Sequence, residues 1–390
     1  MDGYEQVLNR FLRSESMRPW LGGVKSLSFN PEFADWDDKR GYRFFHDFAG
    51  RLPNLRYLII DCADWTVAPH HPSTFRMFSQ FPSVTYLEMY QTEFPSFNDF
   101  RRALSSLPSL STLVLYNWNY RWFPLPHHEL WQNASPQKRP VLRVFRIRFD
   151  LTQEELDVLF HWLLQTPSRL SIRDLAFSTL HLHKGPLRQP CIDFVDTVAP
   201  SVSTLRIDCR EAISLRNFLD LHTLVVDMVP GQWEQLKGLL RDLPSRLRCL
   251  QLDSIPTLVL PAAGTLDHGL YNADSFTESH GHGVSQLDAC LSLESLSELQ
   301  TLELELSVQK LGTHLRREVE SSRPYDLQTY FISVLEPFIE QPGKYLLWVI
   351  EDSVEDGIRN GLTSLRTPGR EVELIMTTHR DCILERSPWR

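Results

Sequence analysis

The stretch LPNLRYLII at Leu52–Ile60 returns as FPSVTYLEM at Phe81–Met89 and as LPSLSTLVL at Leu107–Leu115. The last six residues of each copy follow one pattern: an apolar residue, two variable ones, Leu or Phe, one variable residue and another apolar one. Apolar residues at alternate positions are typical of a β-strand with one buried face. The pattern occurs ten times, with these central residues: Leu27, Leu58, Leu87, Leu113, Phe145, Leu175, Leu205, Leu224, Leu250 and Leu302. Most spacings are 26 to 32 residues, which predicts a repeat protein.

Helical patterns lie between the strand patterns. They cover residues 42–52, 97–107, 152–165 and 233–243, and a further one follows at 327–340. A strand, a helix and a returning parallel strand make a right-handed coil, and no unit can bury its apolar face without its neighbours. The predicted fold class is therefore α/β, a solenoid of about ten irregular strand–helix units that form one curved parallel sheet.

The strand pattern and its spacing resemble a leucine-rich repeat. The long irregular units, their Leu-Pro lead-ins and the aromatic-rich text between them resemble the leucine-rich-repeat part of fungal F-box-like proteins, over roughly residues 20–310. Regular repeats carry a ladder of Asn side chains after the strand, but the equivalent positions here hold other residues: Ala63, Thr92, Trp118, Asp150, Leu180 and Arg210. The resemblance implies substrate recognition for a ligase. Residues 1–23 show no F-box pattern, so we do not expect this chain to bind the ligase adaptor.

Three regions are predicted along the chain. Residues 1–20 form an N-terminal helical cap, residues 21–310 form the solenoid, and residues 311–390 form a C-terminal α/β cap and tail, with a strand at 372–376. Gly, Ser, His and Asp are frequent at about 256–290, which predicts a flexible insertion in the solenoid.

Composition restricts the class of partner. The chain has 390 residues and a net charge of -9, which argues against a nucleic-acid binder because such proteins need a basic surface. We find no apolar run long enough to span a membrane and no signal-peptide pattern. The six cysteines have no paired spacing, which favours an intracellular protein, cytoplasmic or nuclear.

The sequence contains no recognised catalytic or phosphate-binding motif, so we expect a non-enzymatic protein without cofactors. Two groups of residues could supply metal ligands: His181, His183 and Cys191, and His268, His280 and His282. Neither has ligand spacing on a rigid element. An enzyme or metal site in the 256–297 insertion stays open as an unfavoured alternative.

The strand pattern also assigns the side chains of the concave face. The third, fifth and seventh residues of each unit should point there, because side chains alternate along a strand. The face changes from aromatic through arginine-bearing to acidic, and its candidate partner-binding residues are Tyr57, Tyr86, Tyr90, Tyr116, Trp118, Arg146, Arg148, Arg206, Asp227, Asp253, Glu303 and Glu305. Tyr, Trp and Arg dominate the energetics of protein interfaces. The sequence therefore predicts a scaffold for an unidentified protein partner, and an orphan structural repeat domain from a truncated reading frame is the alternative.

Overall fold

The computed structural model divides into two compact units, Met1–Leu205 and Arg206–Arg390, which are described separately below. It describes residues 14–29, 48–66, 74–117, 139–149, 153–178, 189–209, 213–228, 232–244, 247–255, 285–306, 362 and 372–378.

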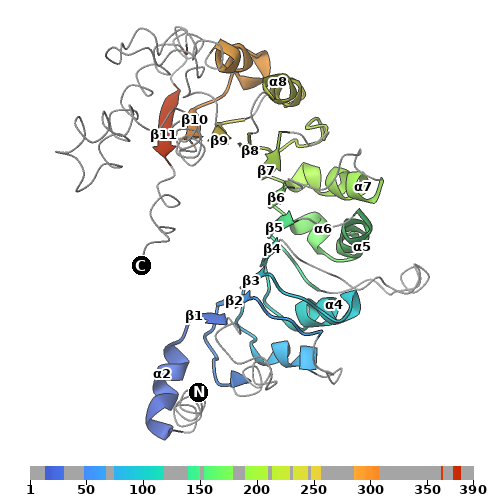
Figure 1. The fold of residues 1–390 in the computed structure, drawn as a ribbon, viewed down its shortest axis with the longest axis vertical. Coiled ribbons are helices and arrows are strands. Elements are labelled where there is room, and N and C mark those ends of the chain that lie inside the picture. Colours follow the sequence, from blue (N-terminus) through green and yellow to red (C-terminus); the bar gives the residue numbers. More distant parts are fainter. Residues whose placement is uncertain are drawn as a thin grey trace, which may run out of the picture. The chain divides into compact units, whose positions relative to one another are not determined.

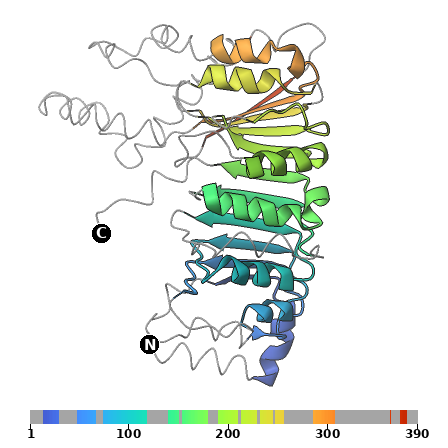
Figure 2. The same ribbon diagram turned by 90° about the vertical axis from the view of Figure 1, so that its right-hand side faces the viewer.

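The first unit is built on parallel strands in chain order. They are β1 (Ser26–Phe29), β2 (Tyr57–Asp61), β3 (Tyr86–Tyr90), β4 (Thr112–Asn117), β5 (Val144–Phe149) and β6 (Asp174–Ser178), followed by β7 (Thr204–Asp208), which contains the unit boundary. From β1 to β6 each strand pairs with the next in parallel. Figure 2 shows these strands as successive rungs.

The second unit continues with β8 (Thr223–Asp227), β9 (Cys249–Ile255), β10 (Thr301–Leu306) and β11 (Glu373–Thr378), again parallel. The eleven strands belong to one sheet in the order β1 to β11. The predicted fold class is confirmed: the protein is an α/β leucine-rich-repeat solenoid on a single parallel sheet.

The repeated leucines form the core directly beneath the sheet. Within the first unit, register aligns Leu27, Leu58, Leu87, Leu113, Phe145 and Leu175; within the second it aligns Leu224, Leu250, Leu302 and Leu374. Of the aligned residues, those from Leu58 to Leu302 are fully buried, whereas Leu27 in the first strand and Leu374 in the last are half-buried. A column of leucines, with Phe145 in one position, is stable here because each side chain fills the space between its two neighbours.

Helices cover one face of the sheet. In the first unit they are α4 (Phe97–Ser106), α5 (Gln153–Leu164), α6 (Ser168–Ser171) and α7 (Gln189–Val198), drawn on the same side of the strands in Figure 1; η1 (Glu15–Met17) and α2 (Arg18–Gly23) precede β1. Shorter 3-10 turns, η4 (Thr74–Gln80) and η6 (Ala199–Ser201), complete the layer. The second unit has α8 (Trp233–Arg241), a helical segment at 285–291, and η7 (Glu294–Leu296).

The predicted helices at 97–107, 152–165 and 233–243 are confirmed as α4, α5 and α8. At the start of α4, Ser96 Oγ accepts from the Asp99 N–H at 3.2 Å and donates to Asp99 Oδ2 at 2.7 Å, which satisfies an otherwise free helix donor. Phe97 and Phe100 on α4 pack edge-on against Trp162 of α5. The helix predicted at 327–340 lies outside the described residues, as do residues 42–47 of the one predicted at 42–52; Phe48 is helical and residues 49–51 form a turn.

A ladder of polar side chains links successive repeat units at the start of their strands. The residue just before the first apolar position of a unit donates to a backbone carbonyl of the preceding unit: Ser83 to Leu55, Ser171 to Leu142, Ser201 to Ile172, Ser109 to Pro82 and Asn54 to Gly22, at 2.7 to 2.8 Å. Thr92, at one position of the expected Asn ladder, is buried and its hydroxyl donates to the Tyr90 carbonyl. This strand-start ladder satisfies backbone carbonyls at the start of the strands, whereas the Asn ladder of regular repeats lies after the strand.

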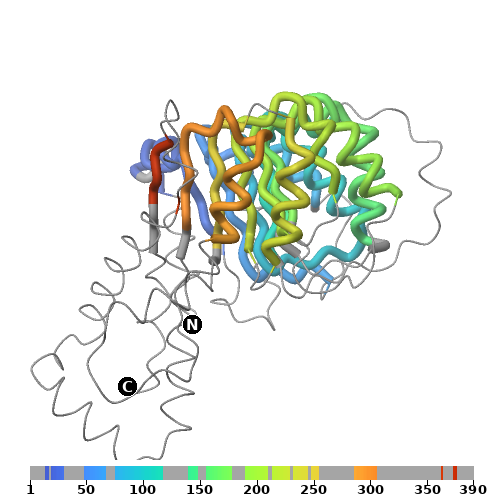
Figure 3. The backbone as a smooth tube through the Cα atoms, turned by 90° about the horizontal axis from the view of Figure 1, so that it is seen from above, coloured from blue at the N-terminus to red at the C-terminus, as the bar shows by residue number. Residues whose placement is uncertain are grey.

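The predicted outer regions are described only in part. The strand expected at 372–376 is present as β11, which lies beside β10 (red and orange in Figure 3). Helix 285–291 overlaps the end of the predicted insertion at 256–290, and residues 256–284 lie outside the described part. The proposed N-terminal helical pattern before residue 14 also lies outside it.

Candidate interaction face

In the first unit, the tyrosines predicted to form the binding face do lie on the side of the sheet opposite the buried leucines. Tyr57 pairs with Tyr86 between β2 and β3, and Tyr90 pairs with Tyr116 between β3 and β4. Tyr57 is 49% exposed and Tyr90 is 36% exposed, whereas Tyr86 and Tyr116 are half-buried. We call Tyr57, Tyr86, Tyr90 and Tyr116 the tyrosine patch.

The patch is held in place by its own contacts. The rings of Tyr57 and Tyr86 lie 5.6 Å apart between centroids and are tilted by 50°, a favourable aromatic geometry. The Tyr86 hydroxyl donates to Glu88 Oε2 at 2.5 Å. Burial, together with this hydrogen bond, raises the pKa of Tyr86 above its ordinary range, so the phenol remains neutral at physiological pH.

The arginine next to the patch is paired. Arg146 on β5 makes a two-point contact with Asp174 on β6, with Nε to Oδ1 at 3.2 Å and Nη2 to Oδ2 at 2.5 Å. The guanidinium is half-exposed, so it keeps hydrogen-bonding capacity toward a partner while its charge is balanced. Arg148 also lies on β5, in register with Tyr116, but its side chain is not among those described; Trp118 lies outside the described residues.

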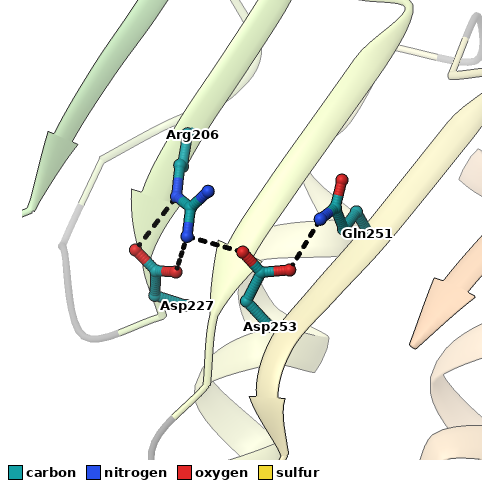
Figure 4. A network of polar contacts seen from close by, with 4 residues as sticks. All are labelled: Arg206, Asp227, Gln251 and Asp253. Atoms are coloured by element: carbon teal, nitrogen blue, oxygen red, sulfur yellow. Dashed lines mark hydrogen bonds and ion pairs between the residues drawn. The ribbon is translucent and has the colours of Figure 1, made fainter. Parts of the chain in front are cut away.

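In the second unit the predicted acidic positions behave differently. Arg206 Nη2 lies 2.7 Å from Asp227 Oδ1 and 2.5 Å from Asp253 Oδ2, so one guanidinium serves two carboxylates (Figure 4). Gln251 Nε2 donates to Asp253 Oδ1 at 2.8 Å. We call these four residues the Arg206 cluster.

The Arg206 cluster corrects the prediction of an exposed acidic end. Asp227 and Asp253 are buried, with side chains 12% and 2% exposed, because neighbouring strands and the guanidinium cover them. Charges that are already paired and desolvated offer little to a partner without breaking those contacts. Glu303 is half-buried beside Cys249, and the Glu305 side chain is not described.

The thiols of Cys249 and Cys290 are poor nucleophiles. Burial, and then the neighbouring Glu303, raises the pKa of Cys249 to about 11, and burial raises that of Cys290 to about 11. Cys191, one candidate metal ligand, is buried in the apolar face of α7, which contradicts its role as a loop ligand. The histidines of both candidate groups lie outside the described residues.

The described part of the chain also bears on metal binding, cavities and membrane spans. Its residues include no group of three or more His, Cys, Asp or Glu placed to hold a metal. A cavity of about 240 Å³ lies between α8 and helix 285–291, lined by Trp233, Glu234, Lys237 and Cys290 among others. None of the helices that the structure describes is long and apolar enough to cross a membrane.

The alternation of the sequence predicted which side chains lie on this face of the sheet, but not how those side chains pair with one another. Arg206 and Asp253 are far apart along the chain, and the order of β7, β8 and β9 in the sheet brings them together. Val114 lies on the same face as the tyrosine patch and is nevertheless buried, since the longer side chains around it cover it. Alternation correctly places Gln251 on this face, but nothing in the sequence indicated that it would donate to the carboxylate of Asp253.

Comparison with known proteins gives little beyond the fold. No family model matches the chain, and no curated protein sequence matches it. Among the solved structures that match is a TLR13–ssRNA13 complex, with 14% sequence identity and a TM-score of 0.32. The match covers 67% of this chain and 37% of that one, so the chain spans little more than a third of its length. The fold assignment therefore rests on the strand register and the leucine core.

Proposed function

We propose that the protein is a non-enzymatic interaction scaffold that binds a protein partner through the tyrosine patch. The observation that carries the proposal is the pair of exposed aromatic side chains, Tyr57 and Tyr90, on a rigid sheet whose other face is fully packed. Exposed aromatic rings on a solvent-facing sheet mark interaction sites, since water contact with that much apolar surface is unfavourable.

The patch fits a partner segment that presents apolar or aromatic side chains. Tyr57 and Tyr90 are 49% and 36% exposed, so a partner that covers both residues removes roughly 170 Å² of surface from water. At about 25 cal/mol per Å² of apolar area this burial contributes at most about 4 kcal/mol, from which the cost of association is subtracted. The phenol hydroxyls and the half-exposed Arg146 can hydrogen-bond at the rim. Because Arg146 is already paired with Asp174, binding here should depend weakly on salt.

We further propose that the chain is the substrate-recognition region of an F-box-like protein. It is supported by the irregular repeat units with Leu-Pro lead-ins that resemble that family. A patch-dependent partner whose abundance in cells falls when an F-box is fused to the chain would support this role. A patch-dependent partner whose abundance does not change would contradict it.

The test of the proposed function is affinity purification with matched variants. Tagged chain should retain a specific protein that the double variant Tyr57→Ala/Tyr90→Ala loses. Leu170→Ala is the control, since Leu170 is 68% exposed in the same unit but belongs to α6 rather than to the sheet face. A partner retained by the patch variant and lost by the control would overturn the proposal, and capture of no specific protein would favour an orphan structural domain.

A further inference from the structure

Strand β11 differs from the ten repeat strands in sequence. Each repeat unit places an apolar residue three positions before its central residue, for example Val84 before Leu87 and Leu299 before Leu302, and all of these except Val24 in the first unit are buried. The equivalent position before Leu374 holds Glu371. This strand is therefore an addition to the sheet rather than an eleventh repeat, and this is why the repeat pattern did not include it.

Backbone pairing is what places β11 on the sheet. It aligns with β10 over six residues, from Thr301 opposite Glu373 to Leu306 opposite Thr378. The Glu373 N–H donates to the Gln300 carbonyl at 2.8 Å, which repeats the bond that the N–H of Thr301, opposite Glu373, makes to the Arg248 carbonyl at 2.9 Å. This is the geometry by which an extended peptide adds to an exposed sheet edge.

The side chains of β11 contribute less to the core than those of β10. Leu302 is fully buried, whereas Leu374, which is in register with it, is only half-buried. Residues 307–372 separate the two strands, so the chain connection does not by itself require that edge and strand come from one copy. Every copy carries both the edge and the strand that fits it.

We propose that β11 is an exchangeable strand: the outer edge of β10 binds segment Glu373–Thr378 of its own chain, or the same segment of a second copy. Reciprocal exchange gives a symmetric dimer without any new surface, because each copy supplies the strand that the other lacks. This inference does not depend on the tyrosine patch.

The test uses the register between the two strands. Glu305 lies opposite Thr377, so a chain with Glu305→Cys mixed with a chain with Thr377→Cys should form a disulfide between copies in oxidised glutathione. Mass spectrometry of the linked peptides distinguishes this bond from one to a native cysteine. A chain carrying both substitutions reports pairing within one copy.

Exchange predicts a disulfide between residues 305 and 377 of different copies. Sedimentation should show a fraction of dimer that increases with protein concentration. Glu373→Pro removes the N–H that bonds to Gln300 and should abolish the dimer, whereas Glu373→Ala retains the N–H and should keep it. A synthetic peptide of residues 372–378 should compete with the dimer. A link that forms only within one copy, or in neither design, would overturn the proposal; peptide binding without any link between copies would assign the edge to another protein instead.

Discussion

Replacing Arg206 by methionine should destabilise the second unit by about 2–3 kcal/mol. The substitution keeps a long apolar side chain but removes the only cation of the Arg206 cluster, and it leaves Asp227 and Asp253 charged side by side. Breaking a buried ion pair by removing one partner costs roughly 3–5 kcal/mol. We expect a smaller loss than this range because the Arg206 side chain is 29% exposed, so water can reach the vacated position.

A double-mutant cycle separates charge from packing. Asp253→Asn in the Arg206→Met background removes one of the two like charges and keeps the oxygen that accepts from Gln251. The double variant should therefore be more stable than Arg206→Met alone, by about 1 kcal/mol or more. Urea denaturation gives the free energies, and hydrogen exchange should show lost protection in β8 and β9 but not in β2 to β4.

The matched control is Arg216→Met. Arg216 lies 3.0 Å from Asp242 in the same unit, but its side chain is 74% exposed, so its loss should cost less than 1 kcal/mol. If Arg206→Met costs no more than this control, or if the double variant is as unstable as the sum of the single ones, the cluster does not stabilise the fold by charge pairing.

Three further outcomes follow from the structure. Leu113→Ala should cost about 2–5 kcal/mol in urea denaturation because the side chain is fully buried between Leu87 and Phe145, and a loss below 1 kcal/mol would contradict the core. Ser201→Ala should cost about 1 kcal/mol, since its hydroxyl donates to the Ile172 carbonyl at 2.7 Å, and unchanged stability would mean that the strand-start ladder is incidental. Glu303→Gln should lower the pKa of Cys249 from about 11 while burial keeps it above the ordinary value, so its alkylation should speed up at alkaline pH; an unchanged pH profile of that peptide by mass spectrometry would argue against the contact.

The sequence predicted the strands well because the physical requirement for each is local and repeated. All ten predicted central residues, from Leu27 to Leu302, occupy the second position of a strand from β1 to β10. A strand in a solenoid must place an apolar residue there to reach the shared core, and the alternation around it then fixes which side chains face outward. The same alternation correctly placed Tyr57, Tyr86, Tyr90 and Tyr116 on the face away from the leucines.

Burial on that face could not be predicted in the same way. Alternation gives the direction of a side chain, but whether Asp227 or Val114 is covered depends on its neighbours in other strands. The ladder through Ser83 and Ser201 was missed for a related reason: its acceptors are backbone carbonyls, which leave no trace in the sequence. Strand β11 was predicted as a strand but not as part of the sheet, because Glu371 breaks the repeat pattern.

The central claim is that a partner binds the tyrosine patch, and the most direct measurement is the dissociation rate of the purified partner from Tyr90→Ala. Aromatic anchors act mainly through the area they bury, so this variant should dissociate faster and bind about 30-fold more weakly, equivalent to about 2 kcal/mol. Leu170→Ala should bind like the unmodified chain, and raising the salt concentration should change the affinity little. An unchanged dissociation rate for Tyr90→Ala together with weakened binding of Leu170→Ala would place the interaction on the helical side and contradict the account.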